Sequence, residues 1–319
     1  MKVRMKRIYK MKTMRKILQI PILIMFIFVT GFSSSPLNEF KLNSSEYKLL
    51  LAPTKFDDID QGFRDYWAIV KTVAEEQGIP ITESEHPYKI KRKDISFFDT
   101  QNLDLKKNGY MLRRKNKYNN GHRIPGSEFS LKFRSNRLKL AATADVVIGE
   151  GYTPKDEKIE LESDIVYFTK INGGKEITYS VQNPVELDES QSFKVGEIAK
   201  VYPVLSSFDL PEDAELGLVA GVSAEEKMIR PGKFEFGDGL KGRVDITVWI
   251  VELGGEQIKI PEFSFDHPFP EDREYSEEAL RKCTTFIEKL QEKAPEWVVP
   301  GKLKAAYLFE SAIQNREEK

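Results

Sequence analysis

The sequence has little of what builds cross-links or transition-metal sites. Its 319 residues include a single cysteine, Cys283, which excludes an intrachain disulfide. The three histidines, His86, His122 and His267, stand far apart in the sequence, with none at helical ligand spacing. This distribution argues against a zinc site built from His and Cys. Cys283 falls in a predicted helix, and we interpret it as a small buried residue.

The sequence also lacks an apolar run long enough to span a membrane. Its longest run, Ile20–Val29, has ten residues, whereas a spanning helix needs about 20. Eight basic and no acidic side chains precede the run within the first sixteen residues, and Gly31 and Ser33–Ser35 follow it. This order predicts a signal peptide over residues 1–35, with an uncleaved membrane anchor at residues 17–32 as the alternative. We therefore expect an exported protein, periplasmic or extracellular, whose main domain spans residues 36–319.

The formal net charge of −1 conceals an asymmetry between the N-terminus and the rest of the chain. Without the eight N-terminal cations, 41 basic side chains face 50 acidic ones, so the rest carries about −9. A body this acidic is not drawn to nucleic acid by bulk charge, and we expect no nucleic-acid partner. Any contact with a membrane is expected to be transient and made through the N-terminal segment alone. A site for an anion must be a local basic cluster.

Hydrophobic periodicity predicts a single α+β domain. Apolar residues three to four positions apart predict helices over Asp57–Gly78 and Ser276–Lys293, capped by Asp57 or Asp58 and by Ser276. A last helix is expected over Gly301–Asn315, whereas Val195–Leu205 is ambiguous. Alternating runs bounded by turn residues predict strands over Tyr47–Ala52, Tyr88–Thr100, Gly109–Asn116, Ser127–Ser135, Lys158–Phe168, Lys175–Gln182, Glu215–Val222, Lys227–Phe236, Gly242–Leu253 and Gln257–Phe265. Their short separations favour antiparallel pairing.

Charged residues recur on one face of several predicted strands, because alternate residues of a strand point the same way. The residues that share a face in this way are Glu46 with Lys48, Arg113 with Lys115, Lys132 with Arg134, Glu160 with Glu162 and Asp164, and Glu262 with Ser264. One interpretation is that these are the solvated faces of half-exposed strands. The other is a closed or nearly closed barrel with charges inside, basic ones for an anion and acidic ones for metal cations.

Four segments, taken in order, resemble the CYTH or triphosphate tunnel family. Phe97–Thr100 with Leu112–Lys115 resembles its YFDT…LRxR segment, and Glu128–Arg134 is similar to the following strand with its Lys-x-Arg. Lys158–Ile165 looks like its acidic strand, and Glu262–Phe265 like a late acidic strand. The match runs from about residue 44 to about residue 310.

The resemblance implies an eight-stranded antiparallel β-tunnel with flanking helices, in which basic side chains grip a triphosphate and glutamates hold magnesium or manganese. By position, it implies three catalytic residues, Lys48, Arg113 and Lys132, three substrate-binding residues, Lys115, Arg134 and Arg230, and four metal-side acids, Glu46, Glu160, Glu162 and Glu262. The implied function is an exported, metal-dependent triphosphate or polyphosphate phosphohydrolase. One alternative is a non-catalytic relative that binds an anionic, phosphate-rich small molecule in the tunnel. Another is an exported structural or partner-binding protein with no ligand in the barrel.

The first strand departs from the family's pattern. Where the family has Glu-x-Glu-x-Lys, this chain reads Ser44-Ser45-Glu46-Tyr47-Lys48. A serine hydroxyl is a poor substitute for a carboxylate on a hard cation. Ser44 therefore separates the phosphohydrolase from the non-catalytic alternative.

Overall fold

A computed structural model of the chain describes residues 40–155, 159–169, 174–188, 192–299 and 303–317. The chain divides into Met1–Asn38 and Glu39–Lys319, and all described residues belong to the second part. The predicted signal peptide or anchor lies outside the described residues. Among the residues that are described, no helix combines the length and apolar character needed to cross a membrane.

Strands make up most of the described chain. They are β1 (Ser44–Leu50), β2 (Ile81–Glu83), β3 (Lys91–Asp99), β4 (Tyr110–Asn119), β5 (His122–Arg123), β6 (Ser127–Ser135), β7 (Glu160–Thr169), β8 (Gly174–Leu187), β9 (Gly217–Ile229), β10 (Gly232–Gly237), β11 (Leu240–Leu253) and β12 (Glu256–Pro268). The α-helices are α1 (Ile59–Glu76), α2 (Asp104–Lys107), α3 (Leu138–Ala142), α4 (Val195–Val201), α5 (Glu277–Lys293) and α6 (Lys304–Glu317).

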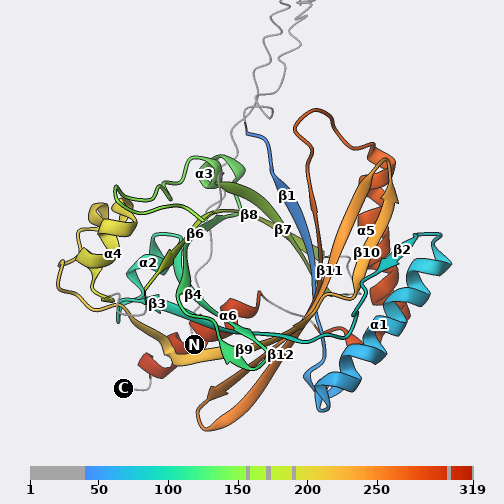
Figure 1. Ribbon diagram of the computed structural model, residues 1–319, viewed down its shortest axis with the longest axis horizontal. Helices are drawn as coiled ribbons and strands as arrows, with labels where there is room; N and C mark the ends of the chain where they lie inside the picture. The colour runs from blue at the N-terminus through green and yellow to red at the C-terminus, as the bar shows by residue number, and fades with distance from the viewer. Residues whose placement is uncertain (1–39, 156–158, 170–173, 189–191, 300–302, 318–319) are drawn as a thin grey trace, which may run out of the picture. The chain divides into compact units, whose positions relative to one another are not determined.

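Nine of these strands close into a barrel. Their order is β12-β1-β7-β8-β6-β4-β3-β9-β11, and β11 pairs with β12 again to complete the ring. Figure 1 looks through this ring, with α6 seen inside it and α1 and α5 beside β10 and β2. The strands β10 and β2 continue the sheet beyond the ring, because β10 pairs with both β11 and β2. The fold is therefore α+β with a closed barrel.

The prediction of a wholly antiparallel, eight-stranded tunnel is wrong in two linked respects. The ring has nine strands, and β1 runs parallel to β7, with Ser44 opposite Glu162 and Lys48 opposite Val166. A closed ring with an odd number of strands cannot alternate direction at every step, so one parallel pair is required. A parallel pair needs a long connection, and the chain between β1 and β7 is more than long enough.

Strand bounds follow the sequence prediction closely in some places and miss in others. The predicted strand Ser127–Ser135 is β6 residue for residue. The predicted break after Val222 is wrong, because β9 runs on to Ile229 and pairs there with β11. The break comes instead at Pro231, which has no backbone N–H to offer a ladder. The residues that connect the predicted strands Lys158–Phe168 and Lys175–Gln182 lie mostly outside the described residues.

The outer face of the barrel packs against helices and forms the main core. In α1, Phe63, Trp67, Val70 and Ala74 are buried, as their spacing predicts, and Asp58 accepts a hydrogen bond from Gln61 N at 3.0 Å as the N-cap. In α5, Ser276 accepts from Ala279 N at 3.3 Å, and Cys283 is fully buried beside Phe286 and Ile287. Alternate residues of the same strands, such as Leu49, Val244, Phe263 and Phe265, face these helices. Residues that alternate with them, such as Lys48 and Glu262, line a cavity inside the barrel.

Candidate functional site

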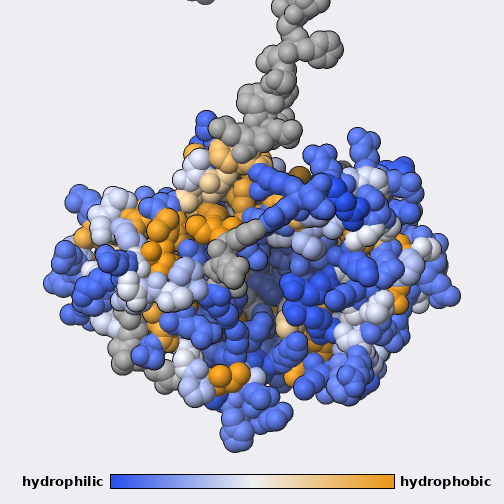
Figure 2. All heavy atoms as spheres, turned by 45° about the horizontal axis from the view of Figure 1, so that its top comes forward, coloured by the Kyte–Doolittle hydropathy of each residue, from blue (hydrophilic) through white to orange (hydrophobic). Residues whose placement is uncertain are grey.

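A polar cavity of about 250 Å³ lies inside the barrel. It is lined by Glu46, Lys48, Phe97, Met111, Arg113, Lys115, Lys132, Arg134, Glu162, Gln182, Glu226, Trp249, Glu262, Leu303, Lys304 and Ala305. Figure 2 shows a recess near the centre of one face, walled by hydrophilic residues. Six side chains of the lining are cationic and four are acidic. The interpretation that the alternating charges face a lumen, and are not merely solvated outer faces, therefore fits the fold.

Eight of the ten residues predicted for the site line this cavity. Strand β1 places Glu46 and Lys48 there, β4 places Arg113 and Lys115, β6 places Lys132 and Arg134, and β7 and β12 place Glu162 and Glu262. The barrel thus gathers residues more than 200 positions apart in the sequence. What they bind or catalyse stays a prediction.

The other two predicted residues, Glu160 and Arg230, do not line the cavity. Glu160 lines a second cavity, of about 530 Å³, which shares Glu162 with the first and lies where β1 and β7 begin. Arg230 follows β9 directly, and its guanidinium donates to both carboxylate oxygens of Asp245, at 2.7 and 2.8 Å. An ion pair with a partner on the neighbouring strand explains this arginine without a ligand.

A buried carboxylate, Asp164, anchors one wall of the cavity. Its side chain is wholly inaccessible, receives a hydrogen bond from Lys48 Nζ, and receives another from Arg134 Nη2 at 2.8 Å. Burial alone would raise the pKa of Asp164, but Arg134 and Lys48 hold it well below its usual range. In the same way burial lowers the pKa of Lys48, whereas Asp164 and Glu46 raise it overall. Both groups are therefore charged at any ordinary pH.

The cations of the opposite wall, Arg113 and Lys115, have fewer close negative partners. Arg113 Nη2 donates to the neutral amide of Gln182 at 3.0 Å, and no carboxylate of the described residues forms an ion pair with Arg113. The Nε atoms of Arg113 and Arg134 are buried and donate to no described group. Burial lowers the pKa of Arg113. Burial, followed by the charge of Arg113, also lowers the pKa of Lys115 to about 8, despite its ion pair with Glu128.

The C-terminal helix α6 closes one end of the cavity, a feature that the sequence prediction missed. Lys304, its first residue, contacts Glu262 at 2.9 Å, donates to Thr247 Oγ1 at 2.5 Å, and lies 5.1 Å from the centre of the Trp249 ring. Phe309 of α6 packs edge-on against Phe97 at 5.8 Å. The apolar residues of α6 follow no regular helical spacing, so no local pattern in the sequence marked Lys304 as a site residue.

Glu226 and Gln182 were also missed, although strand alternation could have found them. Glu226 is nearly buried, accepts from Trp249 Nε1 at 2.9 Å and pairs with Lys93 at 3.1 Å. Burial raises its pKa, but Lys93 and Lys304 lower it to about 2 overall. The prediction had ended one strand at Val222 and begun the next at Lys227, so Glu226 lay in neither strand and could not be assigned to an inner face.

The carboxylates do not form a metal site as they stand. No three His, Cys, Asp or Glu groups of the described residues come together closely enough to hold a metal ion. Each predicted metal-side acid of the cavity is held by a lysine, Glu46 by Lys48 at 2.7 Å, Glu162 by Lys132 at 3.1 Å, and Glu262 by Lys304 at 2.9 Å. The donor set thus does not fit magnesium or manganese in this arrangement, and the metal stays a prediction.

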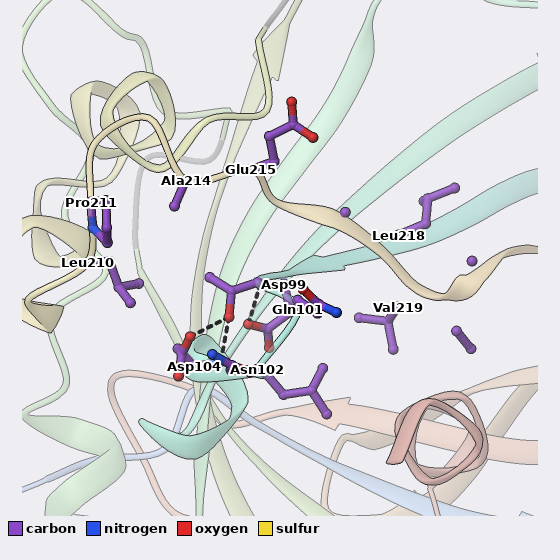
Figure 3. A pocket seen from close by; sticks show the side chains of 15 residues that line it. Asp99, Gln101, Asn102, Asp104, Leu210, Pro211, Ala214, Glu215, Leu218 and Val219 are labelled. Atoms are coloured by element: carbon purple, nitrogen blue, oxygen red, sulfur yellow. Dashed lines mark hydrogen bonds between the residues drawn. The ribbon is translucent and has the colours of Figure 1, made fainter. Parts of the chain in front are cut away.

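A larger cavity, of about 830 Å³, lies where β3 ends and β9 begins (Figure 3). Its lining has three acids, Asp99, Asp104 and Glu215, and no cation. The most buried of them, Asp99, accepts from the backbone N–H groups of Thr100, Leu105 and Lys106 at 2.8 to 3.0 Å. These bonds fix the turn into α2, so Asp99 has a structural role, and the cavity offers nothing to an anion.

No family model and no curated protein matches the sequence. Several solved structures match. One is HpAC1 from Hippeastrum, described as a candidate adenylyl cyclase with a dominant triphosphatase activity; the match covers 85% of this chain and 96% of that one, at 16% identity and a TM-score of 0.42. A candidate adenylate cyclase from Bacillus halodurans has 13% identity, coverage of 84% and 100%, and a TM-score of 0.37. The PH1819 protein from Pyrococcus horikoshii OT3 has 14% identity, coverage of 86% and 99%, and a TM-score of 0.34. At such values, what this chain binds has to be inferred from its own side chains.

Proposed function

We propose that the barrel binds a phosphate-rich anion of the tripolyphosphate class in its central cavity. The observation that carries this proposal is the wall formed by Arg113 and Lys115. A buried guanidinium that donates a hydrogen bond to a neutral amide, next to a lysine with a pKa of about 8, is costly in the ligand-free protein. An anion placed between them would supply the missing charge and accept hydrogen bonds from the buried donors.

The shape of the site favours a small, highly charged ligand. Cations reach the cavity from three barrel strands, β1, β4 and β6, and from α6, so they surround a ligand on several sides. Apolar and aromatic side chains, such as Phe97, Met111 and Trp249, form only a minority of the lining. Linear phosphates have the charge density for such a cage, and a bidentate guanidinium suits their oxygens.

The proposal is tested with two arginine variants of the full-length chain, Arg113→Gln and Arg230→Gln. Each removes one guanidinium from the barrel region, but only the first removes it from the cavity lining. We expect tripolyphosphate to raise the melting temperature of the wild type in a concentration-dependent way. In Arg113→Gln we expect the Kd, measured by calorimetry, to rise by roughly thirtyfold or more, as for loss of a desolvated charged contact.

The same pair of variants separates a ligand-binding role from a structural one. Because burial disfavours the charged form of Arg113, we expect Arg113→Gln to melt at least as high as the wild type without ligand. Arg230→Gln breaks an ion pair with Asp245, and we expect it to melt lower yet keep the ligand-induced shift. If tripolyphosphate shifts none of the three proteins, the proposed function is wrong.

A second candidate is the metal-dependent phosphohydrolase that the sequence resemblance implies. It is favoured by the position of Glu46, Glu162 and Glu262 on the lining of one cavity. Hydrolysis with a metal would require these carboxylates to exchange their lysine partners for a divalent cation. Phosphate release from tripolyphosphate with added magnesium or manganese tests this, and binding without release in either metal would leave the anion-binding function alone.

We also infer export from the N-terminal basic and apolar segments of the sequence. Fractionation of cells that express the chain, with N-terminal sequencing of the mature protein, would locate it and show whether residues 1–35 are removed. Recovery of the uncleaved chain in the cytoplasmic fraction would contradict this inference.

A further inference from the structure

A row of cations leads out of the cavity along β4. Arg113, Lys115 and Lys117 are alternate residues of this strand and share its inner face. Successive members are about 7 Å apart along the strand, at roughly 3.4 Å per residue. The first two line the cavity, and Lys117 lies beyond it. The basic lining therefore continues past the enclosed space.

Three lysines at the outer end of this row share one carboxylate. Lys115 Nζ donates to Glu128 Oε1 at 3.0 Å, Lys117 Nζ donates to Oε2 at 2.9 Å, and Lys155 Nζ also donates to Oε2. We call Lys115, Lys117 and Lys155 the lysine rim. Glu186 is a second acid, 3.6 Å from Lys155, but its side chain is largely exposed. The rim therefore keeps an excess of positive charge.

The carboxylate at the centre of the rim stays ionised. Burial would raise the pKa of Glu128, but Lys115 and the two other lysines hold it far below its usual range. Without Lys117 and Lys155, Glu128 and Lys115 would form a simple one-to-one pair. Lys117 and Lys155 thus add two positive charges to this pair, and of the described residues only the largely exposed Glu186 lies close enough to offset one of them.

The rim and α6 lie at opposite ends of the cavity. Lys93 of β3 is opposite Lys117 of β4, whereas Phe97, four residues further along β3, packs against Phe309 of α6. Four residues of a strand span about 13 Å. At its far end the cavity meets Leu303 and Lys304 at the start of α6. A ligand too long for the cavity can therefore extend away from α6 and past the rim.

Building on the anion-binding function proposed above, we propose that the lysine rim is a subsite for a linear inorganic polyphosphate chain longer than tripolyphosphate. The chain end is held in the cavity between Arg113 and the wall made by Lys132 and Arg134. The following phosphates pass out over Lys117 and Lys155. In this proposal binding is end-on, because the start of α6 lines the other end of the cavity.

The test compares tripolyphosphate with long-chain polyphosphate on the full-length chain. The rim variant is Lys117→Ala/Lys155→Ala, which removes the two lysines outside the cavity. The matched control is Lys200→Ala/Lys282→Ala, which removes two exposed lysines that pair with Glu197 and Glu278 on helices α4 and α5. Both double variants change the net charge equally, so a bulk effect of charge affects them alike.

We expect the wild type to bind long-chain polyphosphate more tightly than tripolyphosphate. The rim variant should lower the affinity for the long chain about three- to tenfold more than that for tripolyphosphate, as expected for two partly exposed charge contacts. The control should change the two affinities equally. Polyphosphate blocked at both ends as phosphoramidates should lose most of its affinity for the wild type.

Three outcomes would overturn the proposal, and they can be told apart. If tripolyphosphate does not bind, the proposed function fails and the subsite fails with it. If tripolyphosphate binds but the rim variant weakens both ligands equally, the cavity function stands and the rim subsite is wrong. If end-blocked polyphosphate binds as tightly as the free-ended chain, the rim can still contact the ligand but binding is not end-on.

Discussion

The pKa of Lys115 predicts how the affinity for tripolyphosphate depends on pH. In the ligand-free protein, burial and the charge of Arg113 lower this pKa from 10.5 to about 8. A bound polyanion would raise it back toward its ordinary value. The pKa of Lys115 is lower in the free protein than in the complex, so binding favours protonation of Lys115. Its contribution to binding is therefore complete below pH 8. The contribution is lost progressively as the pH rises from 8 toward 10.5.

The magnitude follows from the two pKa values. Within this window the affinity falls by about tenfold for each pH unit, because one unit of pKa is 1.36 kcal/mol. Between pH 7.5 and pH 9.5 the loss amounts to about twentyfold, taking 8 for the free protein and 10.5 for the complex. Lys115 lines the cavity, and only about a quarter of its side chain is exposed, so solvent screening is limited.

The control is Lys115→Arg, which keeps the positive charge across this range. Tripolyphosphate itself changes charge with pH, and the arginine variant experiences the same change, so the ratio of the two affinities isolates Lys115. Calorimetry in buffers of different ionisation enthalpy should also show uptake of up to one proton near pH 9 in the wild type alone. Identical pH profiles for the two proteins would refute a role for Lys115 in binding.

Three further predictions concern stability, measured as the free energy of unfolding in urea. Asp164→Asn should destabilise the barrel by about 3 to 5 kcal/mol, because it leaves Arg134 and its neighbours buried without their counter-charge; a loss below 1 kcal/mol would contradict this. Gly62→Ala should destabilise α1 although alanine favours helices by up to about 1 kcal/mol, because the new Cβ would lie 2.6 Å from the carbonyl oxygen of Lys55; a gain in stability would show that the loop yields. Phe286→Ala, at a fully buried position, should cost about 3 to 5 kcal/mol, and a melting temperature unchanged from the wild type would disprove tight packing there.

Local signals in the sequence were enough for the elements whose bounds depend on near neighbours. The caps Asp58 and Ser276 and the apolar faces of α1 and α5 could be predicted, because a helix is fixed by residues three to four apart. The strand Ser127–Ser135 could be predicted because turn residues bound it on one side and its alternation is regular. Alternation also assigned Arg113 and Lys115 to one face of a strand, but it did not show whether that face lies in solvent or inside a barrel.

The closure of the strands and the pairing of the charges depend on contacts between distant parts of the chain. The parallel pairing of β1 with β7 joins segments more than 100 residues apart, and nothing local encodes the direction in which they meet. Arg230 could not be separated from the cavity residues by sequence, since its ion pair with Asp245 exists only across neighbouring strands. Lys304 entered the site from a helix that only tertiary packing places against the barrel. The order of residues along the chain shows which are charged and which alternate. That they face one enclosed space follows only from the closed ring, because strand pairing and helix docking depend on contacts between distant parts of the chain.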